Sequence, residues 1–340
     1  MTEFTRPSEI VSWLGAVQAQ DYLGALWAVG LRLVGASEPD VEGALAERSI
    51  VRTWPLRGTL HFVAASDARW MLELLGQRVV ARAAGRFRAL GLDEATFARA
   101  RGVLVKGLEG GRRVTRPVAY EMLERAKISV AGQRGIHILW RLAHEIVLCF
   151  GPREGKQHTF VLADEWLPPT RRVARDEALA RLACRYFQGH GPATVQDFAW
   201  WSGLAIAEAR NAVHLAGGRL DEESIGGKRY WLVGAAALSA ASRPRAHLLP
   251  AFDEFLVGFA DRSAVLGGHH ATRVNAGGGI LNPTIVVDGQ IVGTWKRRFV
   301  RGEVIFSPTL LDASDGTDVK SIAIAFRRYA AFLGVRPRGL

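Results

Sequence analysis

Two glutamines, Gln18 and Gln20, stand one residue apart in the stretch VQAQDYLGALW. A glutamine amide accepts a hydrogen bond through its carbonyl oxygen and donates through its NH₂, but it has no useful pKa. The pair could therefore orient a water molecule or a polar substrate, whereas it could not act as a general acid or base. Taken alone, the pair is explained more simply as two polar residues that cap a joint between helices.

The flanking residues predict where this pair lies. Apolar residues recur at helical spacing on both sides of it, and Asp21 occupies the N-cap position of the second run. Residues i and i+2 of one helix point about 200° apart and cannot share a target. In an extended joint the two side chains would point the same way, so cooperation between the glutamines requires the helix break that the sequence predicts.

The charge of the chain indicates a polyanionic partner. Lys and Arg number 44 against 33 Asp and Glu, a net charge of +11, which suits phosphate contacts. A high-GC genome, which enriches arginine in all its proteins, explains the composition equally well. The distribution is more informative, because residues 76–116 contain ten basic and three acidic side chains. Arg78, Arg82 and Arg86 recur every four residues, which predicts one basic stripe on one helix face that contacts phosphates.

Two further basic groups are candidates for DNA contact. Apolar residues alternate over 54–62, which places Arg57 and His61 on the opposite, polar face of a predicted strand or strand pair. They could contact a nucleic acid, although hydrogen bonds that stabilise a hairpin explain them equally well. Lys296, Arg297 and Arg298 follow the sequence GTW, where a strand is expected to end, and could also contact the backbone.

Several other chemistries find no support. The chain has no phosphate-binding Walker loop, dinucleotide fingerprint or zinc spacing, and His269-His270 lacks partners at ligand spacing. We therefore expect no metal and no cofactor. Three acidic residues lie in a region expected to form strands: Asp253, Glu254 and Asp261. They could form a catalytic carboxylate pair, but we favour a structural role in which they pair with an arginine such as Arg262. Trp200 and Trp201 follow helical spacing and are expected in the core.

The cysteine content and the hydropathy pattern indicate the cellular compartment of the protein. Only Cys149 and Cys184 are present, which argues against a disulfide scaffold. No apolar run approaches the roughly 20 residues of a membrane helix, and the first residues do not resemble a signal peptide. We expect a cytoplasmic protein that does not enter membranes.

The order of predicted elements suggests an α+β fold with repeated modules. Helices followed by a two-stranded wing, the winged helix-turn-helix order, are predicted twice, and residues 40–64 could hold a degenerate first copy. The predicted division is a helical region with the first winged-helix module (1–110), a second module (111–170), a third module (171–245) and a β-rich C-terminal region with a closing helix (246–340). The segment 269–279 is expected to be a mobile loop.

Five stretches together resemble the winged-helix DNA glycosylases of the AlkZ and YcaQ type, the azinomycin-resistance family. They cover nearly the whole chain in order and are QAQDYLGALW, RTWPLRGTLHFV, GPATVQDFAWWSGL, LPAFDEFLVGFADR and PTIVVDGQIVGTWKRR. The resemblance implies three tandem winged-helix modules in a C-shaped arrangement with a β-rich C-terminal portion. It also implies removal of alkylated purines, chiefly N7-alkylguanine, from double-stranded DNA, and in some members the unhooking of interstrand crosslinks.

The family motif is Gln, an apolar residue, then Gln or Asp, and Gln18-Ala19-Gln20 matches its two-glutamine version. The match implies that Gln18 and Gln20 are the catalytic pair of a monofunctional, hydrolytic, metal-independent enzyme, which we expect to be a monomer. Asp21 is expected to cap a helix and not to replace the aspartate of the other subgroup. Two alternatives remain open from the sequence, a winged-helix transcription regulator and a lesion-binding protein without catalysis.

Overall fold

The computed structural model describes residues 4–234, 246–267, 270–277, 279–311 and 319–339. The chain has an α+β fold, as expected. Three successive stretches each place helices before a β-hairpin, and a C-terminal sheet with a closing helix follows. No helix of these described ranges is long and apolar enough to cross a membrane.

The first stretch contains the joint that the sequence predicted. Helix α1 ends at Leu14 before Gly15, whose φ of 75° is favourable for glycine. Asp21 caps the next helix, because its carboxylate accepts a hydrogen bond from the Gly24 backbone N–H at 3.2 Å. The elements of this stretch are α1 (Pro7–Leu14), β1 (Val17–Gln18), α2 (Tyr22–Gly30), α3 (Glu38–Ala46), β2 (Ile50–Leu56) and β3 (Thr59–Ala64).

A helical connection leads into the second stretch, with the expected break around Gly91. The connecting helices are α4 (Ala65–Arg82), α5 (Ala84–Ala89) and α6 (Glu94–Leu108). The second stretch consists of β4 (Val114–Thr115), α7 (Arg116–Arg125), α8 (Arg134–His144), β5 (Leu148–Glu154), β6 (Gln157–Leu162) and α9 (Ala163–Trp166).

The third stretch also ends in a hairpin. It consists of α10 (Arg175–His190), α11 (Val195–Ser202), α12 (Ile206–Ala216), a 3₁₀ turn η1 (Gly217–Arg219), β7 (Asp221–Ile225) and β8 (Lys228–Leu232). Gly226 and Gly227 form the predicted turn, with φ values of 58° and 76° that are typical of hairpin turns.

The first two hairpins join in one antiparallel sheet, which the sequence did not predict. Its strand order is β1-β3-β2-β5-β6-β4, and the hairpins meet where Arg52 pairs with Phe150. Strand β1 lies at the edge and pairs with β3, so that Gln18 lies opposite His61. A two-residue edge strand therefore carries the first glutamine of the pair.

The C-terminal region forms a second sheet in the order β15-β14-β13-β12-β9, antiparallel except between β14 and β15. The closing helix α15 lies close to its expected bounds. The elements of the region are β9 (Ala246–Leu249), α13 (Glu254–Val257), α14 (Ala271–Val274), β10 (Asn275–Gly277), β11 (Ile280–Leu281), β12 (Thr284–Val287), β13 (Gln290–Val300), β14 (Glu303–Leu310), α15 (Val319–Phe332) and β15 (Arg336–Arg338).

Two expectations for this region are wrong. Asp253 and Glu254 begin a short helix instead of lying in a strand, because the Asp253 carboxylate caps it by accepting from Phe255 N at 2.9 Å. The segment 269–279, expected to be a loop, contains α14 and strand β10, which pairs with β11 just beyond the segment; residues 269 and 278 lie outside the described residues.

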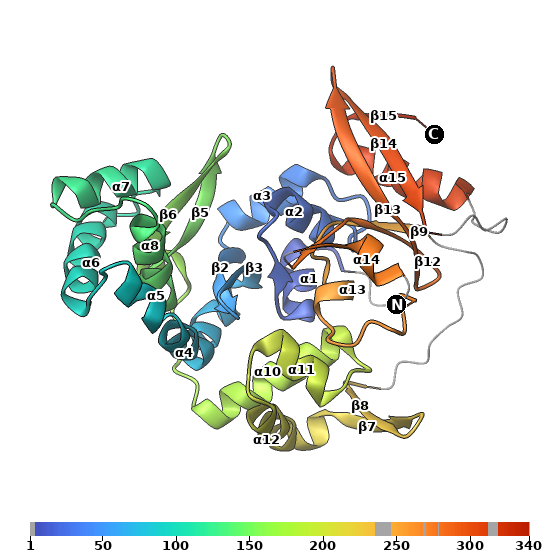
Figure 1. Ribbon diagram of the computed structural model, residues 1–340, viewed down its shortest axis with the longest axis horizontal. Helices are drawn as coiled ribbons and strands as arrows, with labels where there is room; N and C mark the ends of the chain where they lie inside the picture. The colour runs from blue at the N-terminus through green and yellow to red at the C-terminus, as the bar shows by residue number, and fades with distance from the viewer. Residues whose placement is uncertain (1–3, 235–245, 268–269, 278, 312–318, 340) are drawn as a thin grey trace.

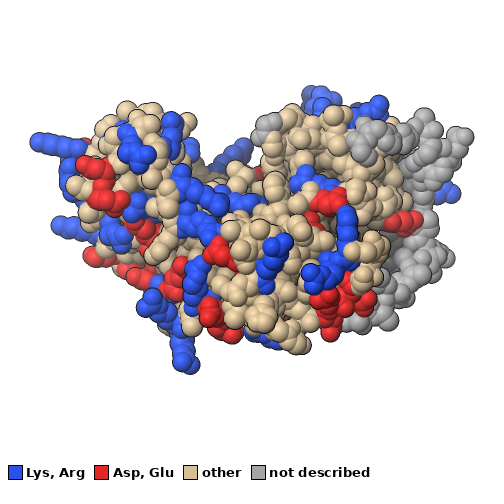
Figure 2. Space-filling view, turned by 60° about the horizontal axis from the view of Figure 1, so that its bottom comes forward, with Lys and Arg blue, Asp and Glu red and all other residues tan. Residues whose placement is uncertain are grey.

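The two ends of the chain share one hydrophobic core. Trp27 of α2 packs its ring 5.0 Å from Tyr329 and 5.1 Å from Phe332 of α15 (centroid distances), and its indole N–H donates to Leu248 O at 2.6 Å. This packing places the first stretch between the other parts, as Figure 1 shows: the second stretch lies to the left, the third below, and the C-terminal sheet at the upper right. Figure 2 shows a hollow between the left and right lobes, with Lys and Arg side chains at its floor.

We expect that Arg32→Met lowers the free energy of unfolding by about 3 to 5 kcal/mol, measured by urea denaturation at neutral pH. Arg32 makes two hydrogen bonds to Asp253, at 2.9 and 2.8 Å, and the Asp253 side chain is fully buried. The substitution would leave a buried carboxylate without a counter-charge. The control is Arg125→Met, which breaks an exposed ion pair with Glu121 and should cost less than about 1 kcal/mol. Equal losses in the two variants would contradict this account.

Candidate functional site

The glutamine pair lies between two helices, and its two members differ in exposure. Gln18 ends strand β1 and is 8% exposed, whereas Gln20 lies at the following bend and is exposed. Ala19 between them is fully buried. The chain therefore anchors the middle of the motif in the interior and leaves the second amide accessible to a substrate.

Backbone hydrogen bonds hold the motif from several sides. The Gln18 N–H donates to the Glu254 carboxylate at 2.9 Å, and the Ala19 N–H donates to Leu60 O at 2.7 Å. The Arg52 guanidinium donates twice to Ala19 O, at 3.1 and 2.7 Å. Since these three backbone groups find their partners in three different elements, the position of the motif backbone is set by the assembled fold.

Glu254 is the centre of a buried polar cluster. Besides the Gln18 N–H, its carboxylate accepts a hydrogen bond from Trp201 Nε1 at 3.1 Å, and His190 Nε2 lies at 3.3 Å. Burial alone would raise the pKa of this carboxyl, but the hydrogen bond and charge of His190 outweigh burial, so the pKa lies below its ordinary value. A buried anion thus lies directly behind the first glutamine.

Arg52 belongs to a cation–aromatic cluster between the first two stretches. Its guanidinium lies 4.8 Å from the ring centroid of Phe150 and 5.4 Å from that of Tyr22, and burial lowers the pKa of Arg52 to about 10. The Arg153 guanidinium also belongs to this cluster. It lies 4.4 Å from the centroid of the Tyr22 ring and forms an ion pair with Glu42. These contacts connect the motif to the hairpin β5–β6.

His61 is not available for the predicted DNA contact, because it is fully buried. Its Nδ1 lies 2.9 Å from Thr59 O, which requires the proton on Nδ1. Burial, reinforced by the positive charge of Arg57, lowers the pKa of His61 to about 4. The ring is therefore neutral at physiological pH and its Nε2 is an acceptor.

Arg57 also has an internal role. It lies in the β2–β3 turn with φ 52°, not on a strand face, and its guanidinium donates to Trp200 O at 2.9 Å and to Trp201 O. Every residue of β2 is buried, so this strand has no polar face exposed to solvent. Trp201 is fully buried as predicted, whereas Trp200 is 49% exposed, so the prediction for Trp200 is wrong.

The predicted arginine stripe is divided between two helices. Arg78 and Arg82 lie on α4, which ends at Arg82, and Arg86 lies on α5. Arg78 forms an ion pair with Glu208 of the third stretch, which contradicts its assignment as a free phosphate contact. Arg82 and Arg86 are exposed, and Arg86 donates to the Gln133 side chain at 2.6 Å.

The basic triplet lies inside strand β13 and not at its end, because this strand continues to Val300. Lys296 and Arg298 are exposed, as the alternation of a strand requires. Arg297 faces the other side, where its guanidinium lies 5.5 Å from the Tyr329 ring centroid. Of the triplet, only Lys296 and Arg298 are therefore exposed.

The carboxylates near Arg262 have other partners than the one expected. Asp253 pairs with Arg32, Glu254 joins the cluster behind Gln18, and Asp261 lies 3.6 Å from Lys228. Arg262 donates to the carbonyl of Leu256 at 2.8 Å. Within the described residues, no three His, Cys, Asp or Glu side chains come close enough to hold a metal ion.

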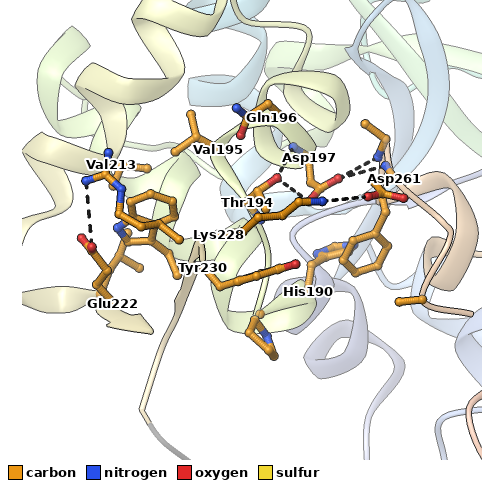
Figure 3. Close-up of a pocket in the computed structure, with 18 of the residues that line it drawn as sticks. His190, Thr194, Val195, Gln196, Asp197, Val213, Glu222, Lys228, Tyr230 and Asp261 are labelled. Carbon is orange, nitrogen blue, oxygen red and sulfur yellow. Dashed lines mark hydrogen bonds and ion pairs between the residues drawn. The ribbon is translucent and has the colours of Figure 1, made fainter. Parts of the chain in front are cut away.

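A cavity of about 1310 Å³ lies in the third stretch, between α11, α12, the β7–β8 hairpin and the segment 259–265. Figure 3 shows the hydrogen-bonded pair Thr194 and Asp197 and the ion pair of Lys228 with Asp261 at its wall. His190 lines the cavity and also contacts Glu254. Neither motif glutamine lines it, so this cavity is separate from the candidate site.

Comparisons with known proteins identify one family. The family model described as DNA glycosylase AlkZ-like matches residues 11–332. An interstrand DNA cross-link repair glycosylase from Streptomyces sahachiroi is 30% identical over 325 residues, which cover 89% of this chain and 85% of that protein. The solved structure of the Streptomyces sahachiroi DNA glycosylase AlkZ is similar with a TM-score of 0.79 at 27% identity, over 98% of this chain and 94% of that chain.

We expect Glu254→Ala to lower the free energy of unfolding by about 3 kcal/mol or more, because three buried donors lose their acceptor. Glu254→Gln retains a carbonyl oxygen for the Gln18 N–H and should cost less. Thermal and urea denaturation of both variants at neutral pH measure the difference. A stability equal to wild type in Glu254→Ala would show that the cluster does not hold the motif.

Proposed function

Because the chain belongs to the AlkZ-like family of DNA glycosylases, we propose that it hydrolyses the N-glycosidic bond of cationic alkylated purines, chiefly N7-alkylguanine. Gln18 and Gln20 are the proposed catalytic residues. The observation that carries the proposal is their placement: both lie in an interrupted segment between α1 and α2, one anchored by Glu254 and the other exposed.

The charge of the lesion explains how two neutral amides can suffice. N7-alkylguanine already carries a positive charge, so the base leaves without receiving a proton. The electron pair of the C1′–N9 bond moves to the base and neutralises it, while a water oxygen forms a bond to C1′ and releases its surplus proton to solvent. The transition state resembles an oxocarbenium ion, as in other glycoside hydrolyses.

The motif then acts through orientation and fixed dipoles. An amide carbonyl accepts a hydrogen bond from the attacking water, and an amide NH₂ donates to the sugar or a phosphate. Preorganised dipoles of this kind stabilise a transition state without acid strength. The proposed reaction is therefore hydrolytic, monofunctional and independent of metal ions.

The proposed DNA-binding surface is the hollow of Figure 2, with the protein acting as a monomer. Four basic side chains that are exposed are the proposed phosphate contacts: Arg82, Arg86, Lys296 and Arg298. The relative from Streptomyces sahachiroi is named for interstrand crosslink repair. We extend the proposal to bulky adducts and crosslinks formed at guanine N7, since these lesions carry the same positive charge.

We expect Gln18→Ala and Gln20→Ala each to lower the single-turnover rate of N7-methylguanine excision by about 10²- to 10³-fold. The product is measured as an alkali-cleaved abasic site in a duplex. The control, Gln77→Ala, removes an exposed glutamine from α4 and should leave the rate unchanged. DNA affinity and melting temperature should change little in Gln20→Ala, and an unchanged excision rate in this variant would rule out the assignment of Gln20.

The same chemistry predicts discrimination by charge. Excision of 1,N6-ethenoadenine should be at least about 100-fold slower than excision of N7-methylguanine, because the uncharged base leaves poorly without an acid. Both lesions are placed in the same duplex sequence and compared under single-turnover conditions. Equal rates would require a general acid that the proposal does not contain.

A further inference from the structure

Three polar side chains form a row across the strands that carry the motif. Gln18 of β1 lies opposite His61 of β3, and His61 lies opposite Thr53 of β2. Side chains of directly opposed residues project from the same face of a sheet. Gln18 is 8% exposed, and His61 and Thr53 are fully buried. The row therefore extends from the catalytic motif into the interior.

Each member of the row presents a buried polar atom that lacks a protein partner among the described residues. These atoms are Gln18 Oε1, His61 Nε2 and Thr53 Oγ1. Buried polar atoms without a partner are costly, and sites that hold internal water typically offer about three such groups. The three atoms also have compatible chemistry, because the amide oxygen and the neutral imidazole nitrogen accept, whereas the hydroxyl can donate.

We propose that Gln18, His61 and Thr53 form a binding site for one internal water molecule, and that His61 is a positioning residue that orients the Gln18 amide through this water. The inference deepens the proposed glycosylase function and rests on it. The water donates one hydrogen to His61 Nε2 and the other to Gln18 Oε1, and it accepts the Thr53 hydroxyl hydrogen. With its carbonyl oxygen held inward, Gln18 presents its NH₂ toward the substrate.

The tautomer of His61 makes this arrangement specific. Thr59 O holds the proton on Nδ1, so Nε2 stays an acceptor while the ring is neutral. The charged groups that influence the ring come from other elements: Arg57 from the β2–β3 turn lowers its pKa and Glu254 from α13 raises it, with His190 behind Glu254. The resulting pKa is about 4, so protonation of His61 would convert Nε2 into a donor and disrupt the water site only in acid.

The chain offers a matched control in His144 of α8. It is also buried, its Nδ1 lies 2.8 Å from Trp140 O, and its Nε2 has no protein partner among the described residues. Burial lowers its pKa to about 4 as well. Because His144 belongs to the second stretch and makes no bond to the motif, its substitution should affect stability but not the reaction.

The decisive measurement is single-turnover excision of N7-methylguanine by His61→Leu, His61→Gln and His144→Leu. We expect His61→Leu to lower the maximal rate by about 10- to 100-fold with DNA affinity unchanged, because the amide is misoriented. His61→Gln, which keeps an acceptor, should recover much of the rate, and His144→Leu should retain the wild-type rate. Thr53→Val should resemble His61→Leu, and Thr53→Ser should resemble wild type.

The pH profile separates orientation from simple stability. The wild-type rate should fall below about pH 5 with an apparent pKa near 4, the same decline should persist in His144→Leu, and it should be absent in His61→Gln. A wild-type rate in His61→Leu, or an acid decline unchanged in His61→Gln, would overturn the proposal.

A high-resolution crystal structure tests the site without relying on activity. We expect one water within hydrogen-bond distance of the three atoms in the wild type, and its loss or displacement in Thr53→Val. If the wild type excises no alkylated purine but contains this water, the proposed function fails and the water site stands. If the wild type is active and the position holds no water, the inference on His61 fails and the glycosylase proposal stands.

Discussion

The fold depends on one buried carboxylate. Glu254 comes from the C-terminal region and receives hydrogen bonds from Gln18 in the first stretch and Trp201 in the third, with His190 beside it. An ion removed from water is stable only if such partners replace its hydration. Because Glu254 and its partners come from three separate parts of the chain, those parts must assemble in one relative position, and the same contact sets the backbone of the motif.

The motif itself is shaped by the interruption between α1 and α2. A continuous helix would satisfy its own backbone groups, whereas an extended segment must find partners elsewhere. Glu254, Leu60 and Arg52 supply them, each from a different element. A segment held in this way carries Gln18 buried and Gln20 exposed. In a continuous helix, side chains two residues apart would point in nearly opposite directions.

Several arginines of this protein form internal contacts, so the net charge does not indicate which residues could contact DNA. Arg32 balances Asp253, Arg52 binds the motif carbonyl, and Arg57 bonds to carbonyl oxygens of α11. The guanidinium group suits these tasks because its several donors reach more than one acceptor at once. Of the eight basic side chains that the sequence singled out for DNA contact, four are exposed, and they lie on α4, α5 and β13.

Local patterns in the sequence determined the α+β class, the helix joint with its Asp21 cap, the glycine turn of the third hairpin and the closing helix, because periodicity and turn chemistry act over a few residues. The glutamine pair was singled out by the resemblance of the sequence to a family, and its catalytic role is a proposal. Only the tertiary structure decided that His61 is buried and that Glu254 holds Gln18. These two depend on partners far along the chain, 236 residues apart for Gln18 and Glu254. A strand's alternation indicates that two faces differ, but whether the polar face meets solvent or a third layer depends on how distant segments pack.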